Sequence, residues 1–113
     1  MPGLVKNHDH ARRLNKSEFM QRIKKIMEDE GVLVLAGTWL AGGFVSTKEC
    51  SVVPDDVKGM KFRAAGKAFE QMLQAAGASI TSMPSSEIYS ALQTGVLDGA
   101  ITSSSSLVSY RIY

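Results

Sequence analysis

Residues 60–66 read Met60-Lys61-Phe62-Arg63-Ala64-Ala65-Gly66 and set the architecture of the chain. The apolar segment from Met60 to Arg63 predicts a short strand, and a helical pattern of apolar residues follows directly after Gly66. Arg63 is therefore expected at the end of a strand, close to a helix N-terminus whose first amide groups have no partner within the helix. A guanidinium in this position is well suited to hold a carboxylate or a phosphate.

A second junction further along the chain follows the same plan. A strand-like segment from Val96 to Thr102 runs into four consecutive serines, Ser103 to Ser106, whose hydroxyls can cap a helix. The two strand-to-helix junctions are predicted to face one pocket.

Strands and helices alternate along the rest of the chain. Ahead of Met60 the hydrophobic pattern predicts a helix over residues 16–30, a buried strand over 32–39, a short strand over 44–47 and one helical turn over 54–59. Beyond Arg63 it predicts a helix over 68–76, a strand over 78–83, a helix over 84–94 and a final helix that begins at Ser103. Short connections between alternating strands and helices indicate an α/β fold built around a sheet.

The segment ahead of the Arg63 strand carries three specific expectations. Asn15 and Glu18 are placed as a capping box, so Asn15 is expected to cap the first helix. The β-branched and aliphatic run from Val32 to Leu35 indicates a strand that is buried in the sheet. Leu40 to Gly43 is expected to form a turn, because glycines interrupt the pattern there.

The charge of the chain limits its partners. With 13 basic and 11 acidic residues the formal net charge is only +2, so a strongly electrostatic partner such as duplex DNA is not implied. Seven basic and two acidic residues lie within residues 1–25. We interpret this cluster as a solvated helix face and predict no nucleic-acid partner, since no interleaved aromatic residues support one.

Membrane and export signals are not apparent in the sequence. No apolar run approaches the roughly 20 residues of a membrane-spanning helix. The first residues, Met1 to Lys6, lack the basic and long apolar regions of a signal peptide, so export is not encoded in this segment.

Several side chains suggest alternative chemistry. Ser103–Ser106 offer nucleophiles, so a small α/β enzyme or a nucleotide-binding domain that uses this junction is the alternative function, although no nucleophile elbow or P-loop motif is present. His8-Asp9-His10 is a weak metal pattern, for which a surface loop is expected, and neither a metal nor a cofactor is predicted. Arg63 could also pair with a surface acid such as Glu87 or Asp98.

Four linked motifs resemble the extracytoplasmic solute receptors of TRAP transporters, of the dicarboxylate-receptor type. In the order of that family they are Lys58-Gly59-Met60-Lys61-Phe62-Arg63, Gly77-Ala78-Ser79, Met83-Pro84-Ser85-Ser86-Glu87-Ile88-Tyr89-Ser90-Ala91-Leu92-Gln93-Thr94-Gly95 and Asp98-Gly99. The resemblance covers nearly the whole chain. It covers only the middle part of the longer, two-lobed fold of the family.

The resemblance implies a fold of the periplasmic-binding-protein type. Residues 1–41 would end the first lobe as a helix plus a crossover strand, and residues 42–113 would form part of the second lobe. The implied function is that of a solute-binding subunit, not an enzyme, which captures an organic acid in the periplasm and delivers it to the membrane permease of a TRAP-type secondary transporter. Its partners would be the organic acid, the permease subunits and the missing lobe of the parent protein.

The same resemblance implies a set of substrate-binding residues. Arg63 matches the family arginine that pairs with the substrate carboxylate. A second polar ligand of the family falls at Thr102, with Ser103 beside it, and Ser85 stands where some members have a stacking aromatic residue. A second arginine found in some members is missing. Trp39 completes the set as a side chain expected either to line the cleft or to pack in the core or at the lobe interface.

Overall fold

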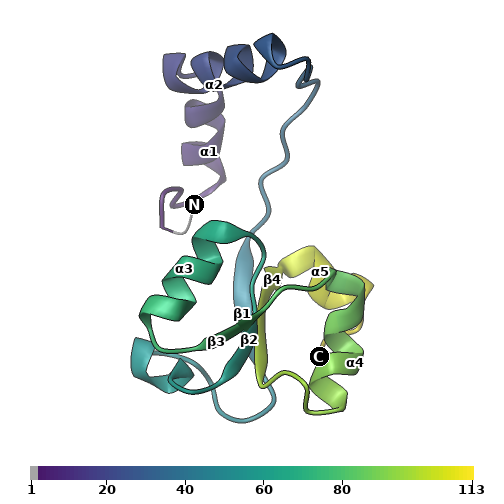
Figure 1. Ribbon diagram of the computed structural model, residues 1–113. Helices are drawn as coiled ribbons and strands as arrows, with labels where there is room; N and C mark the ends of the chain where they lie inside the picture. The colour runs from purple at the N-terminus through teal and green to yellow at the C-terminus, as the bar shows by residue number, and fades with distance from the viewer. Residues whose placement is uncertain (1–2) are drawn as a thin grey trace. The chain divides into compact units, whose positions relative to one another are not determined.

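The chain divides into two compact units, Met1–Trp39 and Leu40–Tyr113 (Figure 1). The computed structural model describes residues 3–113. The first unit contains the helices α1 (His8–Asn15) and α2 (Glu18–Asp29), and the second unit contains a four-stranded sheet with its helices.

The two helices of the first unit begin at side-chain caps. The side-chain oxygen of Asn7 accepts a hydrogen bond from the His10 amide at 2.8 Å, so the loop expected at residues 8–10 is wrong and a helix begins there. The hydroxyl of Ser17 accepts from the Met20 amide at 3.3 Å and donates to the Leu14 carbonyl at 2.6 Å. Ser17 thus caps α2 and also satisfies a carbonyl at the end of α1. The predicted cap at Asn15 is wrong, because Asn15 is the last residue of α1.

The segment between α2 and the sheet is irregular. Residues 32–41, all of which the structure describes, form neither helix nor strand, so the predicted buried strand over residues 32–39 is wrong. Leu35 in this segment is 86% exposed. A β-branched run forms a strand only where a neighbouring backbone supplies the ladder hydrogen bonds. No strand among residues 3–113 pairs with this segment.

The sheet of the second unit has the strand order β1-β4-β2-β3. Its strands are β1 (Gly42–Ser46), β2 (Lys61–Arg63), β3 (Ser79–Thr81) and β4 (Gly99–Ser103). β2 lies parallel to both β3 and β4, whereas β1 is antiparallel to β4. The turn expected at residues 40–43 is wrong, because Gly42 and Gly43 already pair with Ser103 and Thr102 of β4.

Helices cover both faces of this sheet (Figure 1). They are α3 (Lys67–Ala75), α4 (Ile88–Gln93) and α5 (Ser104–Ser109), together with the 3-10 turns η1 (Pro54–Val57) and η2 (Ser85–Glu87). The predicted helix over residues 84–94 thus starts as a 3-10 turn. The prediction of an α/β sheet fold is confirmed. Among residues 3–113, no helix combines the length and the apolar character needed to cross a membrane.

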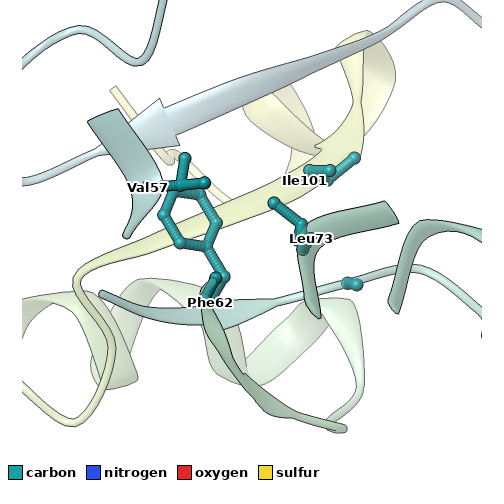
Figure 2. Close-up of a cluster of buried hydrophobic side chains, with 6 residues drawn as sticks. Val57, Phe62, Leu73 and Ile101 are labelled. Atoms are coloured by element: carbon teal, nitrogen blue, oxygen red, sulfur yellow. The ribbon is translucent and has the colours of Figure 1, made fainter. Parts of the chain in front are cut away.

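Two apolar clusters hold these layers together. Figure 2 shows the larger cluster, where Val57, Phe62, Leu73 and Ile101 meet between the sheet and α3. The smaller cluster joins Ala100 to Ile88 of α4 and to Ile112. Neighbouring residues of β4 therefore point to opposite faces of the sheet, as the pleat requires. This alternation determines which side chains share a face with Arg63.

Candidate functional site

Arg63 ends β2 and is only 7% exposed. Its neighbours Phe62 and Ala64 both pack in the larger apolar cluster, on the face that α3 covers. Because side chains alternate along a strand, the Arg63 side chain leaves the sheet on the opposite face, toward η2 and α4. The apolar residues on either side thus hold a charged residue inside the fold.

Three neutral acceptors fix the guanidinium of Arg63. Nε donates to the Met83 carbonyl at 3.0 Å, Nη1 to the Ile101 carbonyl at 3.1 Å and Nη2 to the Ser85 hydroxyl at 3.1 Å. A guanidinium carries five N–H groups, two on each terminal nitrogen. One N–H group on Nη1 and one on Nη2 are left without an acceptor among residues 3–113. Two donors on neighbouring nitrogens match the two oxygens of a carboxylate.

Arg63 has no anionic partner within the part of the chain that the structure describes. The surface pairing with Glu87 or Asp98 that was considered as an alternative is absent there, since Asp98 instead pairs with Lys48 at 2.8 Å. Burial lowers the pKa of the Arg63 guanidinium. The ordinary pKa of arginine is so high that the group remains a cation at neutral pH. Buried charges are normally paired, so a buried arginine held by neutral acceptors alone is unusual.

Ser85 contributes to the same cluster from η2. Its hydroxyl accepts the hydrogen bond from Arg63, and its own proton remains available for a further acceptor. The Met83 carbonyl and the Ser85 hydroxyl both reach Arg63 because Pro84, with a φ of −58° and a ψ of 150°, holds the chain extended between them. One short turn therefore supplies two of the three groups that orient the guanidinium.

Thr102 lies on β4 next to Ile101, whose carbonyl holds Arg63. By strand alternation its side chain shares the sheet face of Ala100 and Arg63. It is 2% exposed, and its hydroxyl oxygen has no hydrogen-bond partner among the described residues. An unsatisfied buried hydroxyl costs about 1–3 kcal/mol. The Thr102 hydroxyl is therefore a polar group that lacks a partner on the same sheet face as the guanidinium.

Ser103 and Trp39 are not among the groups that accept hydrogen bonds from Arg63. The Ser103 hydroxyl accepts from the Ser106 amide at 3.3 Å and lies 2.9 Å from the hydroxyls of both Ser105 and Ser106, so it caps α5 as the sequence predicts. Trp39 is half-buried and is the last residue of the first compact unit. The structure thus joins Ser85 directly to Arg63 and places Thr102 on the same face.

Two contributors to the site were missed by sequence reasoning. They are the main-chain carbonyls of Met83 and Ile101, and no side-chain pattern identifies a carbonyl because every residue has one. Pro84 was the available signal, since a residue before proline is usually extended and cannot continue a helix. For metals, residues 3–113 contain no group of three or more His, Cys, Asp or Glu side chains that could hold an ion.

Comparisons with protein families and with curated proteins show what this chain is similar to. Residues 1–113 match the family model DctP, bacterial extracellular solute-binding protein, family 7. A solute-binding protein of Albidiferax ferrireducens is 38% identical over 112 residues, which cover 99% of this chain and 33% of that protein. The chain therefore spans about a third of the length of this curated relative.

Solved structures show the same similarity. The crystal structure of a TRAP periplasmic solute binding protein from Rhodoferax ferrireducens with bound malonate matches with a TM-score of 0.92 and 38% identity, over 99% of this chain and 35% of that one. A TRAP periplasmic solute binding protein from Sulfitobacter sp. NAS-14.1 with bound β-D-galacturonate matches with a TM-score of 0.86 and 28% identity, over 95% of this chain and 36% of that one. The predicted periplasmic-binding-protein type of fold is confirmed. Because the family model matches its whole length, the chain belongs to family 7 of the bacterial extracellular solute-binding proteins.

Proposed function

We propose that this chain forms part of a solute receptor that captures an organic acid by its carboxylate. The observation that carries the proposal is the buried Arg63 guanidinium, which three neutral acceptors orient and which has one unused N–H group on each terminal nitrogen. A carboxylate would accept one hydrogen bond from each of these nitrogens and would neutralise the buried charge.

The hydroxyls around Arg63 would hold the rest of the ligand. Ser85 would donate its proton to a ligand oxygen while it continues to accept from Arg63. Thr102 would gain the partner that its hydroxyl lacks. In this proposal Ser103 contributes from the cap of α5.

Affinity would depend on a second surface that closes over the site. An exposed arginine–carboxylate pair is worth only about 0–1 kcal/mol, whereas a pair shielded from water is held much more strongly. In this proposal residues 1–41 end the first lobe, residues 42–113 belong to the second lobe, and the remaining part of the first lobe completes the cleft. Closure of the two lobes would be the signal that the membrane partner reads.

The relatives support this assignment. Malonate and β-D-galacturonate, the ligands of the two solved relatives, share a carboxylate and little else. We assign the receptor to the periplasm and the permease of a TRAP-type transporter as its partner, in keeping with the family of extracellular solute-binding proteins. The protein would bind and release its ligand unchanged, so no catalytic residue is assigned.

Calorimetry on the complete gene product that carries this chain tests the proposal. A panel of malonate, succinate, malate and galacturonate should contain at least one acid that binds with a micromolar or lower Kd. Arg63→Ala should abolish this binding, and Arg63→Lys should weaken it strongly, because an ammonium cannot make the paired hydrogen bonds. Arg12→Ala is the matched control, since Arg12 is an exposed arginine whose side chain is 81% accessible.

Two results would overturn the proposal. One is the absence of heat for every acid of the panel with a protein whose circular dichroism shows that it is folded. The other is an unchanged Kd in a folded Arg63→Lys or Arg63→Ala variant.

A further inference from the structure

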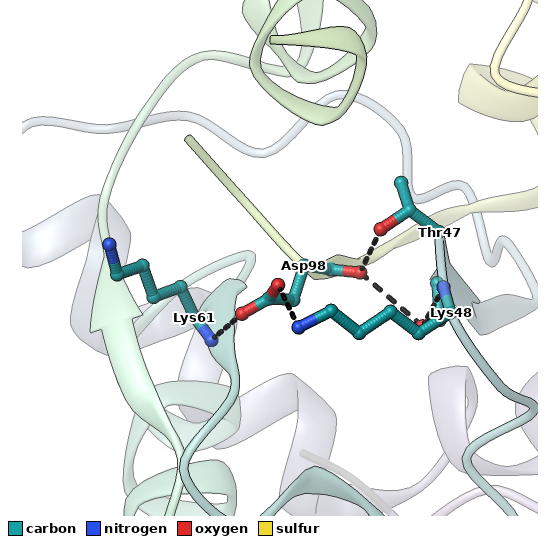
Figure 3. A network of polar contacts seen from close by, with 5 residues as sticks. Thr47, Lys48, Lys61 and Asp98 are labelled. Atoms are coloured by element: carbon teal, nitrogen blue, oxygen red, sulfur yellow. Dashed lines mark hydrogen bonds and ion pairs between the residues drawn. The ribbon is translucent and has the colours of Figure 1, made fainter. Parts of the chain in front are cut away.

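Asp98, the residue just before β4, links three segments of the sheet (Figure 3). Its Oδ2 accepts a hydrogen bond from the Lys61 amide at 2.8 Å, and its Oδ1 lies 2.8 Å from the Lys48 ammonium. Its main-chain carbonyl accepts from the amide of Thr47 at 3.0 Å, from the hydroxyl of Thr47 at 3.2 Å and from the hydroxyl of Ser46 at 3.3 Å. Asp98 therefore connects the end of β1, the loop after it and the start of β2.

The contact with Lys61 is a closed pair of hydrogen bonds. The Asp98 amide donates to the Lys61 carbonyl at 2.9 Å, and the Lys61 amide donates back to the Asp98 carboxylate. The carboxylate oxygen thus takes the place that a main-chain carbonyl holds in a regular ladder. A hydrogen bond to a charged acceptor is stronger than one between neutral groups, so this is a firm anchor at the start of both strands.

β2 needs such an anchor because it is very short. It spans three residues, and only Phe62 and Arg63 are paired with β4, opposite Gly99 and Ala100. A slip of one residue in this pairing would turn every β2 side chain to the other face of the sheet. Arg63 would then point toward the apolar cluster under α3, away from η2.

The position of the guanidinium therefore depends on this register. Arg63 follows Lys61 by two residues on β2, and Ile101 follows Asp98 by three residues on the neighbouring strand. In the observed alignment of these two stretches, Nη1 of Arg63 donates to the Ile101 carbonyl. We propose that Asp98 is a positioning residue for Arg63, whose carboxylate, by holding the Lys61 amide, keeps the guanidinium facing the ligand. This inference rests on the proposed function for its effect on binding.

A purely electrostatic role for Asp98 predicts a different pattern of variants. The Lys48 side chain is 64% exposed, and an ion pair of this kind contributes little. Asp98→Asn removes the charge but keeps an oxygen that can accept from the Lys61 amide. Lys48→Ala removes only the ion pair, whereas Asp98→Glu keeps the charge and displaces the acceptor by one methylene group. Asp98→Ala removes both contacts.

Two measurements on the complete gene product separate these roles. The first is the solvent exchange rate of the Arg63 Nε–H group by ¹⁵N NMR, which reports the hydrogen bond to the Met83 carbonyl and requires no ligand. The second is the Kd for malonate, or for the acid of the panel that binds the unmodified protein most tightly. Loss of one charge-assisted hydrogen bond corresponds to about tenfold or more in an equilibrium constant.

We expect Asp98→Ala to speed Arg63 Nε–H exchange by about tenfold or more and to weaken acid binding by a similar factor. Lys48→Ala should stay within about twofold of the unmodified protein in both measurements. Asp98→Asn should lose about fivefold, because its bond to the Lys61 amide becomes a neutral one, and Asp98→Glu should fall between Asp98→Asn and Asp98→Ala. If Asp98→Ala fails to fold, Asp98→Asn and Asp98→Glu are compared with each other instead. A positioning role predicts slower Arg63 exchange and tighter acid binding in Asp98→Asn, whereas an ion-pair role predicts them in Asp98→Glu.

The inference is wrong if folded Asp98→Ala leaves both quantities unchanged, or if Asp98→Glu retains binding that Asp98→Asn and Lys48→Ala lose. If no acid binds the unmodified protein while Asp98→Ala still accelerates Arg63 exchange, the proposed function fails and the positioning of Arg63 by Asp98 stands.

Discussion

Phe62 and Gly99 face each other across β2 and β4 so closely that a methyl group on Gly99 would lie 2.5 Å from the Phe62 ring. The same methyl group would lie 2.7 Å from the Val45 carbonyl on the other neighbouring strand. The phenyl ring thus covers the backbone of β4 at the residue that follows Asp98. A glycine is required at this position for steric reasons, independently of any contact with ligand.

Gly99→Ala should therefore destabilise the protein by about 1–3 kcal/mol, the usual cost of an overpacked core. Urea denaturation followed by circular dichroism measures the change. Gly43→Ala is the matched control on the adjacent strand, because a methyl group there meets nothing within 4 Å, and it should stay within about 0.5 kcal/mol of the unmodified protein. Equal stabilities of the two variants would show that the ring of Phe62 and the β1 backbone at Val45 both move aside at little cost.

The strands around Phe62 could be predicted from sequence because both faces of this sheet are covered. Residues 60–63, 78–83 and 96–102 are short segments that begin directly after a glycine, and each overlaps a strand in the structure. Residues 32–39 carry the same signal and form no strand. The difference lies in the availability of a hydrogen-bonding neighbour, a long-range property that local composition does not encode.

The candidate site was predictable to a similar degree. The position of Arg63 at a strand end follows from the hydrophobic pattern. The hydrogen bond from Arg63 to Ser85 does not follow from that pattern, because the fold brings the two residues together. The main-chain acceptors at Met83 and Ile101 could not be predicted, because they depend on how two distant segments meet. The sequence indicates Asp98 as a motif residue and as a possible ion-pair partner, but its hydrogen bond to a main-chain amide leaves no trace in the sequence.

Replacement of Thr102 by valine should change stability and binding in opposite directions. The Thr102 hydroxyl is buried without a partner, so Thr102→Val removes an unsatisfied group of nearly the same shape and should stabilise the free protein by about 1 kcal/mol. If the hydroxyl contacts the ligand, affinity for the acid should fall at the same time. Thermal unfolding with and without ligand measures both effects.

Thr94→Val is the control for this substitution. The Thr94 hydroxyl donates to the Ser90 carbonyl at 2.8 Å, so its removal should not stabilise the protein, and affinity should not change. A loss of stability in Thr102→Val would mean that the hydroxyl has a partner in solution and would remove the reason to assign it to the ligand.

The stability of the protein should decrease in acid through two carboxylates. The Lys48 side chain and then the Lys61 amide lower the pKa of Asp98, and the Val53 and Val52 amides lower the pKa of Asp56. A carboxyl group with a lowered pKa in the folded state stabilises the fold above its unfolded pKa of about 3.9, and this contribution is lost as the pH falls through the folded pKa. Urea midpoints recorded from pH 7 down to about pH 2 should therefore fall below pH 5.

Single amide replacements identify the groups responsible for this acid sensitivity. Asp98→Asn and Asp56→Asn should each flatten the decline of the urea midpoint, since neither side chain titrates. Asp55→Asn is the control, because Asp55 is the exposed neighbour of Asp56 in η1. An equally steep decline in all three variants would assign the acid sensitivity to other groups.

Ser85→Ala should weaken ligand binding more than it weakens the fold. The variant removes the acceptor of the Arg63 Nη2 group, which frees the guanidinium on one side, and it also removes a hydroxyl proton that could reach the ligand. A net hydrogen bond contributes about 0.5–1.5 kcal/mol to stability, so the melting temperature should fall only slightly, whereas the Kd should rise by about tenfold through the loss of both orientation and a donor.

Ser85→Thr keeps the hydroxyl and should restore most of the affinity. Ser86→Ala, an exposed neighbour within η2, should leave the Kd unchanged. Equal Kd values for Ser85→Ala and Ser86→Ala would show that the carbonyls of Met83 and Ile101 are sufficient to orient Arg63 and that the hydroxyl of Ser85 does not reach the ligand.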